Sequence, residues 1–161
     1  MKHSVLLDTS FFVRLLKEED SLHKNAKGYF KYFLENEIIQ KVSTISIAEY
    51  CVKGKIDELP LRNVQIIPFN LDHAKRTGEF AEAIFEENKI SNEKLAPRAI
   101  IPNDSKLFAQ ADLDLEIKYF VTSDTRSRNT LQLLKKRLTP RFELLDIFTP
   151  YNENFGILDF N

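Results

Sequence analysis

The stretch Val5-Leu6-Leu7-Asp8-Thr9-Ser10 decides the fold, because a short apolar run ends in a carboxylate and two hydroxyl side chains follow at once. An apolar run of this kind, without polar alternation, is typical of a strand that is buried on both faces. Ser and Thr are common at helix starts. We therefore predict a strand over 3–7 and a helix over 11–17, capped by Thr9 or Ser10.

Three later stretches repeat this pattern of an apolar run followed by an acid. They are 42–47 before Glu49, 99–103 before Asp104, and 119–123 before Asp124. If the runs are neighbouring strands of one parallel sheet, the four acids converge at its C-terminal edge, where open α/β sheets place ligands. Carboxylates placed together raise one another's pKa, so the cluster needs a cation. The simplest is a hard divalent ion with oxygen ligands, Mg²⁺ or Mn²⁺.

The rest of the chain alternates predicted strands and helices. Predicted strands cover 41–45, 64–69, 117–122 and 142–148, and predicted helices cover 22–36 with Ser21 as the cap, 46–53, 71–88, 103–113 and 125–138. This order predicts the α/β class: a three-layer sandwich with a mainly parallel central sheet flanked by helices. We place this domain in residues 1–148, with a polar connection at 89–98 and a C-terminal tail at 149–161.

Composition excludes several other classes of protein. The 23 basic and 24 acidic residues nearly cancel, so nucleic-acid binding requires a local patch. None of the four glycines forms a GxGxxG or P-loop motif, which argues against dinucleotide and NTP sites. Cys51 is the only cysteine and is predicted to be a core residue, so no internal disulfide is possible. No apolar run is long enough for a membrane span, and we expect a cytoplasmic protein without a membrane partner.

Each acid also has a purely structural explanation. Ser46-Ile47-Ala48-Glu49 fits a capping box. Asp8 and Asp124 are plausible N-caps, and Asp104 suits the first turn of a helix. The set favours a metal site more than any single member does, because all four follow apolar runs.

Four motifs, taken in order, resemble the PIN domain, a family that includes the VapC-type toxins of bacterial and archaeal toxin–antitoxin pairs. They are Leu6-Leu7-Asp8-Thr9-Ser10, Ser46-Ile47-Ala48-Glu49, Asn103-Asp104 with the helix to Ala111, and Val121-Thr122-Ser123-Asp124. The resemblance extends from about residue 2 to residue 147. It implies a metal-dependent endoribonuclease, a hydrolase that uses Mg²⁺ or Mn²⁺ and leaves a 5′-phosphate and a 3′-hydroxyl.

The resemblance also implies roles for individual residues. Asp8, Asp104 and Asp124 would hold the metal, and Glu49 would ligate it through water or orient the nucleophile. The hydroxyls would hold the acids in place, and these are Thr9, Ser10 and Thr122; as caps or strand residues they have an equally good structural explanation. The implied partners are an RNA substrate and a small antitoxin protein. We also expect a homodimer, because the first helices carry many apolar residues: Phe11, Phe12, Leu15, Tyr29, Tyr32 and Phe33.

A second signal concerns the substrate. The run 125–142 contains six basic residues and no acid, and Arg126 and Arg128 lie directly after Asp124. These two arginines are predicted to contact RNA phosphates. The alternative is a solvated helix whose cations have no role in binding.

Other functions remain open. A non-catalytic PIN-like module that binds RNA or protein is one alternative, although the presence of all four acids favours catalysis. A phosphotransferase of the haloacid dehalogenase type also starts with a similar motif, but it needs an acid where Ser10 stands. Within the nuclease class, a toxin and a housekeeping RNA-processing enzyme are both compatible with the sequence.

Overall fold

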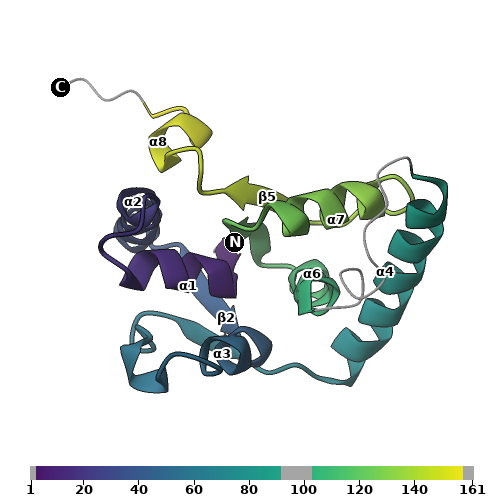
Figure 1. Ribbon diagram of the computed structural model, residues 1–161, viewed down its shortest axis with the longest axis horizontal. Helices are drawn as coiled ribbons and strands as arrows, with labels where there is room; N and C mark the ends of the chain where they lie inside the picture. Colours follow the sequence, from purple (N-terminus) through teal and green to yellow (C-terminus); the bar gives the residue numbers. More distant parts are fainter. Residues whose placement is uncertain (1–2, 92–102, 158–161) are drawn as a thin grey trace.

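The centre of the molecule is one parallel sheet (Figure 1). The computed structural model describes residues 3–91 and 103–157. Its strand order is β3-β2-β1-β4-β5, with bounds β1 Ser4–Leu7, β2 Ile39–Ser43, β3 Gln65–Ile67, β4 Ile117–Thr122 and β5 Glu143–Asp146. Each neighbouring pair runs parallel. The predicted α/β class is therefore confirmed, and β1 lies at the centre of the sheet.

Helices cover both faces of the sheet, which gives the predicted three layers. One face carries α1 (Thr9–Leu16), α2 (His23–Glu35) and the short α8 (Tyr151–Asn154). The other carries α4 (Leu71–Ile90), α6 (Asn103–Leu113) and α7 (Thr125–Lys135). The helix α3 (Thr44–Tyr50) follows β2, and a 3₁₀ turn covers Ile56–Glu58.

Residues of β1 alternate between two hydrophobic cores. Leu6 packs with α4, α6 and α7, whereas Val5 and Leu7 pack with α1 and α2. All four residues of β1 are buried. This burial on both faces explains why the run lacks polar alternation.

Two predicted helix starts are wrong. β2 ends at Ser43, whose hydroxyl accepts a hydrogen bond from the Ile45 amide (3.0 Å), so α3 begins before Ser46 and not at it. Ser21 caps nothing: Asp20 Oδ1 accepts the Leu22 amide at 2.8 Å, and α2 begins without a side-chain cap. The strand β2 therefore ends earlier than the hydroxyl pattern indicates, and the turn before α2 ends one residue later.

The C-terminal segment packs against α2. The ring of Tyr151 lies so close to Gly28 that a Cβ there would be 3.0 Å from it. The rings of Tyr32 and Phe155 stack at 4.7 Å, and the Tyr29 hydroxyl donates to the Thr149 carbonyl at 2.7 Å. The described part of the predicted tail thus contributes to the core on the α2 face, while the boundary at 148 stays a prediction.

Several residues that seemed to offer an interface are core residues. Phe11, Phe12, Tyr29 and Phe33 are all buried within the chain. They are therefore not the surface for the expected homodimer, which stays a prediction. Cys51 shows the opposite error: it is exposed at the end of α3 and not in the core, because α3 presents this side to solvent.

Two predicted segments lie wholly or partly outside the described residues. They are the apolar run 99–103, of which only Asn103 is described, and the polar connection 89–98, of which only residues 89–91 are described, with α4 continuing to Ile90. Within the described part of the chain, no helix has the length and apolarity that a membrane span requires.

Candidate active site

Asp8 is the best-fixed of the four predicted acids. It follows β1, caps α1 and is buried. Its Oδ1 accepts the Thr9 amide at 2.7 Å, and its Oδ2 accepts the hydroxyls of Ser10 and Thr122, both at 2.8 Å. Asp8, and not Thr9 or Ser10, is therefore the helix cap, because the two hydroxyls are turned toward the carboxylate and other groups of the site.

The same hydroxyls connect the ends of β1 and β4. Thr122 Oγ1 accepts the Asp124 amide at 3.0 Å, and Ser10 Oγ accepts the Ser123 amide at 2.9 Å. The hydroxyl oxygens of Ser10 and Thr122 also lie 3.1 Å apart. The positions of Asp8 and Asp124 are therefore set by one hydrogen-bond network across two neighbouring strands.

Glu49 comes to the same place from α3. It does not cap this helix, since Ser43 does so, and the capping-box explanation for Glu49 is wrong. Thr9 Oγ1 donates to one Glu49 oxygen at 2.5 Å, and the amide of Asn103 donates to the other. Burial raises the pKa of Glu49, the Thr9 hydrogen bond opposes the rise, and the charge of Asp8 adds to it.

Asp104 lies in the first turn of α6. Burial, followed by the charge of Asp8, raises its pKa to about 7, and the charges of Asp124 and Glu49 also contribute. The hydroxyl of Ser127 on α7 opposes this rise, because its hydrogen bond favours the ionised form. At neutral pH this carboxyl group thus lies near its titration midpoint.

Asp124 caps α7 and is the acid with a cation of its own. It accepts the Arg126 amide at 2.8 Å, and its Oδ2 pairs with the Arg126 guanidinium at 3.1 Å. The Arg126 side chain is 76% exposed, so this cation lies on the solvent side of the site. Its partner in the prediction, Arg128, pairs with Asp146 at 2.9 Å and not with any of the four acids.

The structure thus brings all four acids into one electrostatic cluster. Burial raises the pKa of Asp8, the hydrogen bonds from Thr122, Ser10 and the Thr9 amide oppose the rise, and the charge of Asp124 adds to it. Among residues 3–91 and 103–157, however, no three His, Cys, Asp or Glu side chains are arranged to hold a metal ion. The cluster therefore has suitable donor atoms without a closed coordination shell.

Sequence reasoning missed several polar contacts of the site. Asn103 anchors Glu49, and Lys106 lies one turn further along α6, where its charge lowers the pKa of Glu49. Arg14 pairs with Asp20 at 2.5 Å and also reaches Ser123 Oγ at 3.4 Å. Arg14 lies four residues after Ser10, and residues at this spacing share a helix face, so the sequence could have indicated that Arg14 lies near the site.

Comparisons with known proteins give a likeness in structure but not in sequence. No family model and no curated protein matches the sequence. A chain of the DNA-bound VapBC complex from Salmonella typhimurium aligns with a TM-score of 0.57 and 14% identity, over 91% of this chain and 99% of that one. A chain of VapBC2 from Rickettsia felis, bound to a DNA fragment from its promoter, aligns with a TM-score of 0.59 and 16% identity, over 89% and 98%. The chain therefore has a VapC-like PIN-domain fold, which confirms the predicted resemblance at the level of the fold.

Proposed function

We propose that the protein is a metal-dependent endoribonuclease. One observation carries this proposal: four acids from separate elements lie near enough to the C-terminal edge of the sheet to act on one another electrostatically, and three of them have raised pKa values. Perturbed acids gathered at a ligand-binding edge are typical of an active site. The likeness to chains of VapBC complexes supports this class of function.

The donor set fits a hard divalent cation. The anionic groups gathered here are carboxylates, and their oxygens suit Mg²⁺ or Mn²⁺ better than softer metals. Asp8, Asp104 and Asp124 would hold the ion, with Glu49 bound directly or through water. When bound, such an ion polarises a phosphate oxygen and lowers the pKa of a coordinated water.

The protein's own groups then have distinct tasks. Thr9 fixes the position of one oxygen of Glu49. Burial raises the pKa of this carboxyl, which favours accepting a proton from the attacking water. Hydrolysis adds the water oxygen to phosphorus and breaks the bond to the 3′ oxygen, leaving a 5′-phosphate and a 3′-hydroxyl. Because the Arg126 side chain is largely exposed, its guanidinium can leave Asp124 and pair with a substrate phosphate instead. Arg128 lies two residues further along the chain.

Cleavage of single-stranded RNA by the purified protein tests this proposal. We expect cleavage with Mg²⁺ or Mn²⁺ and none with EDTA. Asp8→Asn and Asp104→Asn should abolish it, because each removes a carboxylate from the cluster. Asp72→Asn is the matched control, since Asp72 is a largely exposed acid on α4, outside the cluster. Cleavage by Asp8→Asn at the wild-type rate would show that the cluster is not catalytic.

We further propose that the enzyme is the toxin of a toxin–antitoxin pair, with a small antitoxin protein as its partner and a homodimer as its assembly. The likeness to VapBC chains favours this over a housekeeping RNA-processing enzyme. Expression without a partner should stop growth, whereas Asp124→Asn should be tolerated. Sedimentation should show a dimer at micromolar concentration. Normal growth with a catalytically active enzyme would favour the processing role.

A further inference from the structure

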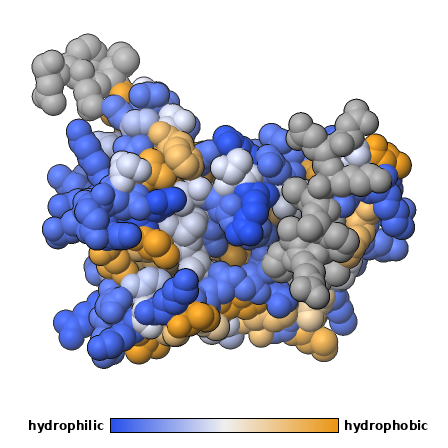
Figure 2. All heavy atoms as spheres, in the orientation of Figure 1, coloured by the Kyte–Doolittle hydropathy of each residue, from blue (hydrophilic) through white to orange (hydrophobic). Residues whose placement is uncertain are grey.

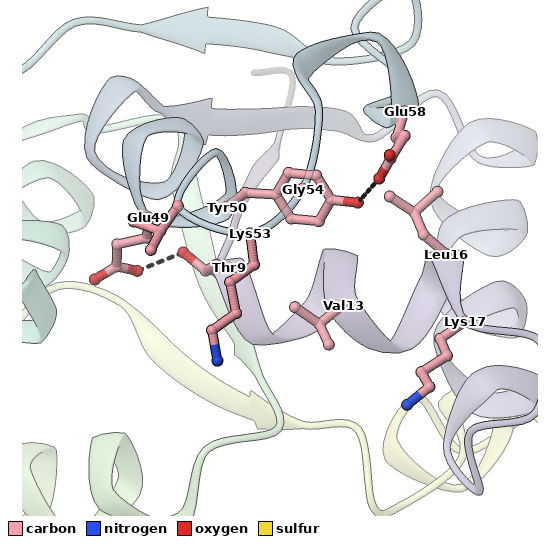
Figure 3. Close-up of a pocket in the computed structure, with 10 residues that line it drawn as sticks. Thr9, Val13, Leu16, Lys17, Glu49, Tyr50, Lys53, Gly54 and Glu58 are labelled. Carbon is pink, nitrogen blue, oxygen red and sulfur yellow. Dashed lines mark hydrogen bonds between the residues drawn. The ribbon is translucent and has the colours of Figure 1, made fainter.

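A groove opens beside the acid cluster, between α1 and the segment that follows α3. Its volume is about 700 Å³, and Thr9 and Glu49 line it together with residues of α1, α3 and the following turn. Figure 3 shows the hydrogen bond between these two residues inside the groove. We call this the α1–α3 groove. A ligand lying in it would be in contact with a member of the proposed catalytic cluster.

The walls of the α1–α3 groove are mainly apolar. Val13, Leu16 and Val52 line it with 43%, 37% and 77% of their side chains exposed. Figure 2 shows apolar surface on the side of α1 that faces α3. Exposed apolar side chains gathered at one place indicate a binding surface.

An aromatic ring forms a further part of the wall. The hydroxyl of Tyr50 donates to Glu58 at 2.6 Å (Figure 3). The backbone of Gly54 packs so closely against this ring that a side chain at position 54 would displace it. Tyr50 is thus held in one orientation by contacts on two sides, and a fixed aromatic ring suits stacking with a base.

Two lysines give the groove its charge. Lys53 and Lys17 both line it, and Figure 3 shows their amino groups in the lower half of the view, on either side of Val13. Neither forms an ion pair within the part of the chain that the structure describes, whereas Arg126 and Arg128 are both paired with acids. These two lysines are therefore cations of the groove itself that are available to an anionic ligand.

We propose that the α1–α3 groove is the subsite for one unpaired nucleotide next to the cleaved bond of the RNA. Its base packs against Tyr50 and the apolar residues of α1, and its phosphate contacts Lys53. A nucleotide matches the combination of a ring, apolar walls and unpaired cations, and Glu49 of the proposed catalytic cluster also lines the groove. This inference rests on the proposed nuclease function and assigns its substrate contacts.

Paired lysine variants test the phosphate contact. The probe is a short fluorescein-labelled single-stranded RNA, and affinity is measured by anisotropy over a range of salt concentrations. All variants are made in the Asp104→Asn background, which prevents cleavage. Lys53→Ala should weaken binding and reduce the slope of log affinity against log salt by roughly 0.7. Lys55→Ala is the control, because Lys55 is exposed on the same turn but does not line the groove.

A ring variant tests the base contact separately. Tyr50→Leu keeps an apolar side chain and all charges, so it should weaken RNA binding about tenfold with an unchanged salt slope. Thermal unfolding confirms that both variants are folded. If Lys53→Ala and Tyr50→Leu bind RNA like their background, the groove serves another ligand, such as a peptide, and this inference is wrong. Failure of the unmodified background to bind RNA would instead count against the proposed function itself.

Discussion

Two clusters of ionisable side chains lie at opposite ends of the same sheet and differ in charge balance. At the N-terminal end of β4, the buried amino group of Lys41 lies 2.6 Å from Asp114 and 2.9 Å from Glu116. At the C-terminal edge, Asp8 lies in a group of four acids, and one of them, Asp124, pairs with the exposed Arg126. The buried charge of the first cluster is paired with acids of the chain itself, whereas the second cluster needs a cation from outside. This difference separates a structural cluster from a candidate active site.

The two clusters also affect stability in different pH ranges. Burial alone lowers the pKa of Lys41, but the hydrogen bonds and charges of Asp114 and Glu116 more than reverse this effect. Because its pKa is raised, the stability from Lys41 is present below pH 10.5 and is lost as the pH rises through the raised value. The raised pKa of Asp104 means that the folded protein binds a proton here more tightly than the unfolded chain does. The stability from this proton is therefore present below about pH 4 and is lost as the pH rises to about 7.

The largest effect should come from removing the partners of the buried Lys41. The double variant Asp114→Asn/Glu116→Gln leaves the buried charge of Lys41 without partners, and we expect the free energy of unfolding to fall by about 3 kcal/mol. Urea denaturation at pH 7 measures this change. Lys41→Met should cost much less, because it removes the buried charge and keeps the apolar stem. Equal losses in the two variants would show that charge balance is not what stabilises this cluster.

Removing one charge from the acid cluster should raise the free energy of unfolding instead of lowering it. Asp104→Asn removes a carboxylate that neighbouring acids disfavour, so the variant should be more stable than the wild type by on the order of 2 kcal/mol at pH 8. The favourable effect of an acid in the first turn of α6 offsets part of this gain. At pH 4 the difference should disappear, because Asp104 is then protonated. Urea denaturation in EDTA at both pH values measures this, and a difference that is independent of pH would contradict it.

The sequence predicted the features that depend on local patterns. The apolar runs without polar alternation predicted β1 and β4. The helix Asn103–Leu113 agrees with its prediction at both ends. Asp8 and Asp124 were placed correctly at strand ends because each directly follows such a run.

Contacts between distant residues could not be predicted. The pairing of Lys41 with Asp114 joins residues that are 73 positions apart, and the contact of Asn103 with Glu49 joins residues 54 apart. Both depend on the sheet order β3-β2-β1-β4-β5, which no local pattern of a single sequence determines. The α1–α3 groove was missed for the same reason, because its two walls come from separate elements.

The smallest effect concerns the cation that the acid cluster already has. Arg126 pairs with Asp124 but is largely exposed, so the pair contributes only about 0.2–1 kcal/mol. A metal ion that binds Asp124 must displace this guanidinium. Arg126→Ala should therefore bind Mn²⁺ about two- to fivefold more tightly in calorimetry. Arg128→Ala is the control, since Arg128 pairs with Asp146 and should leave the affinity for Mn²⁺ unchanged. If both variants bind Mn²⁺ like the wild type, Arg126 does not compete with the metal, and the cluster receives its compensating charge entirely from the ion.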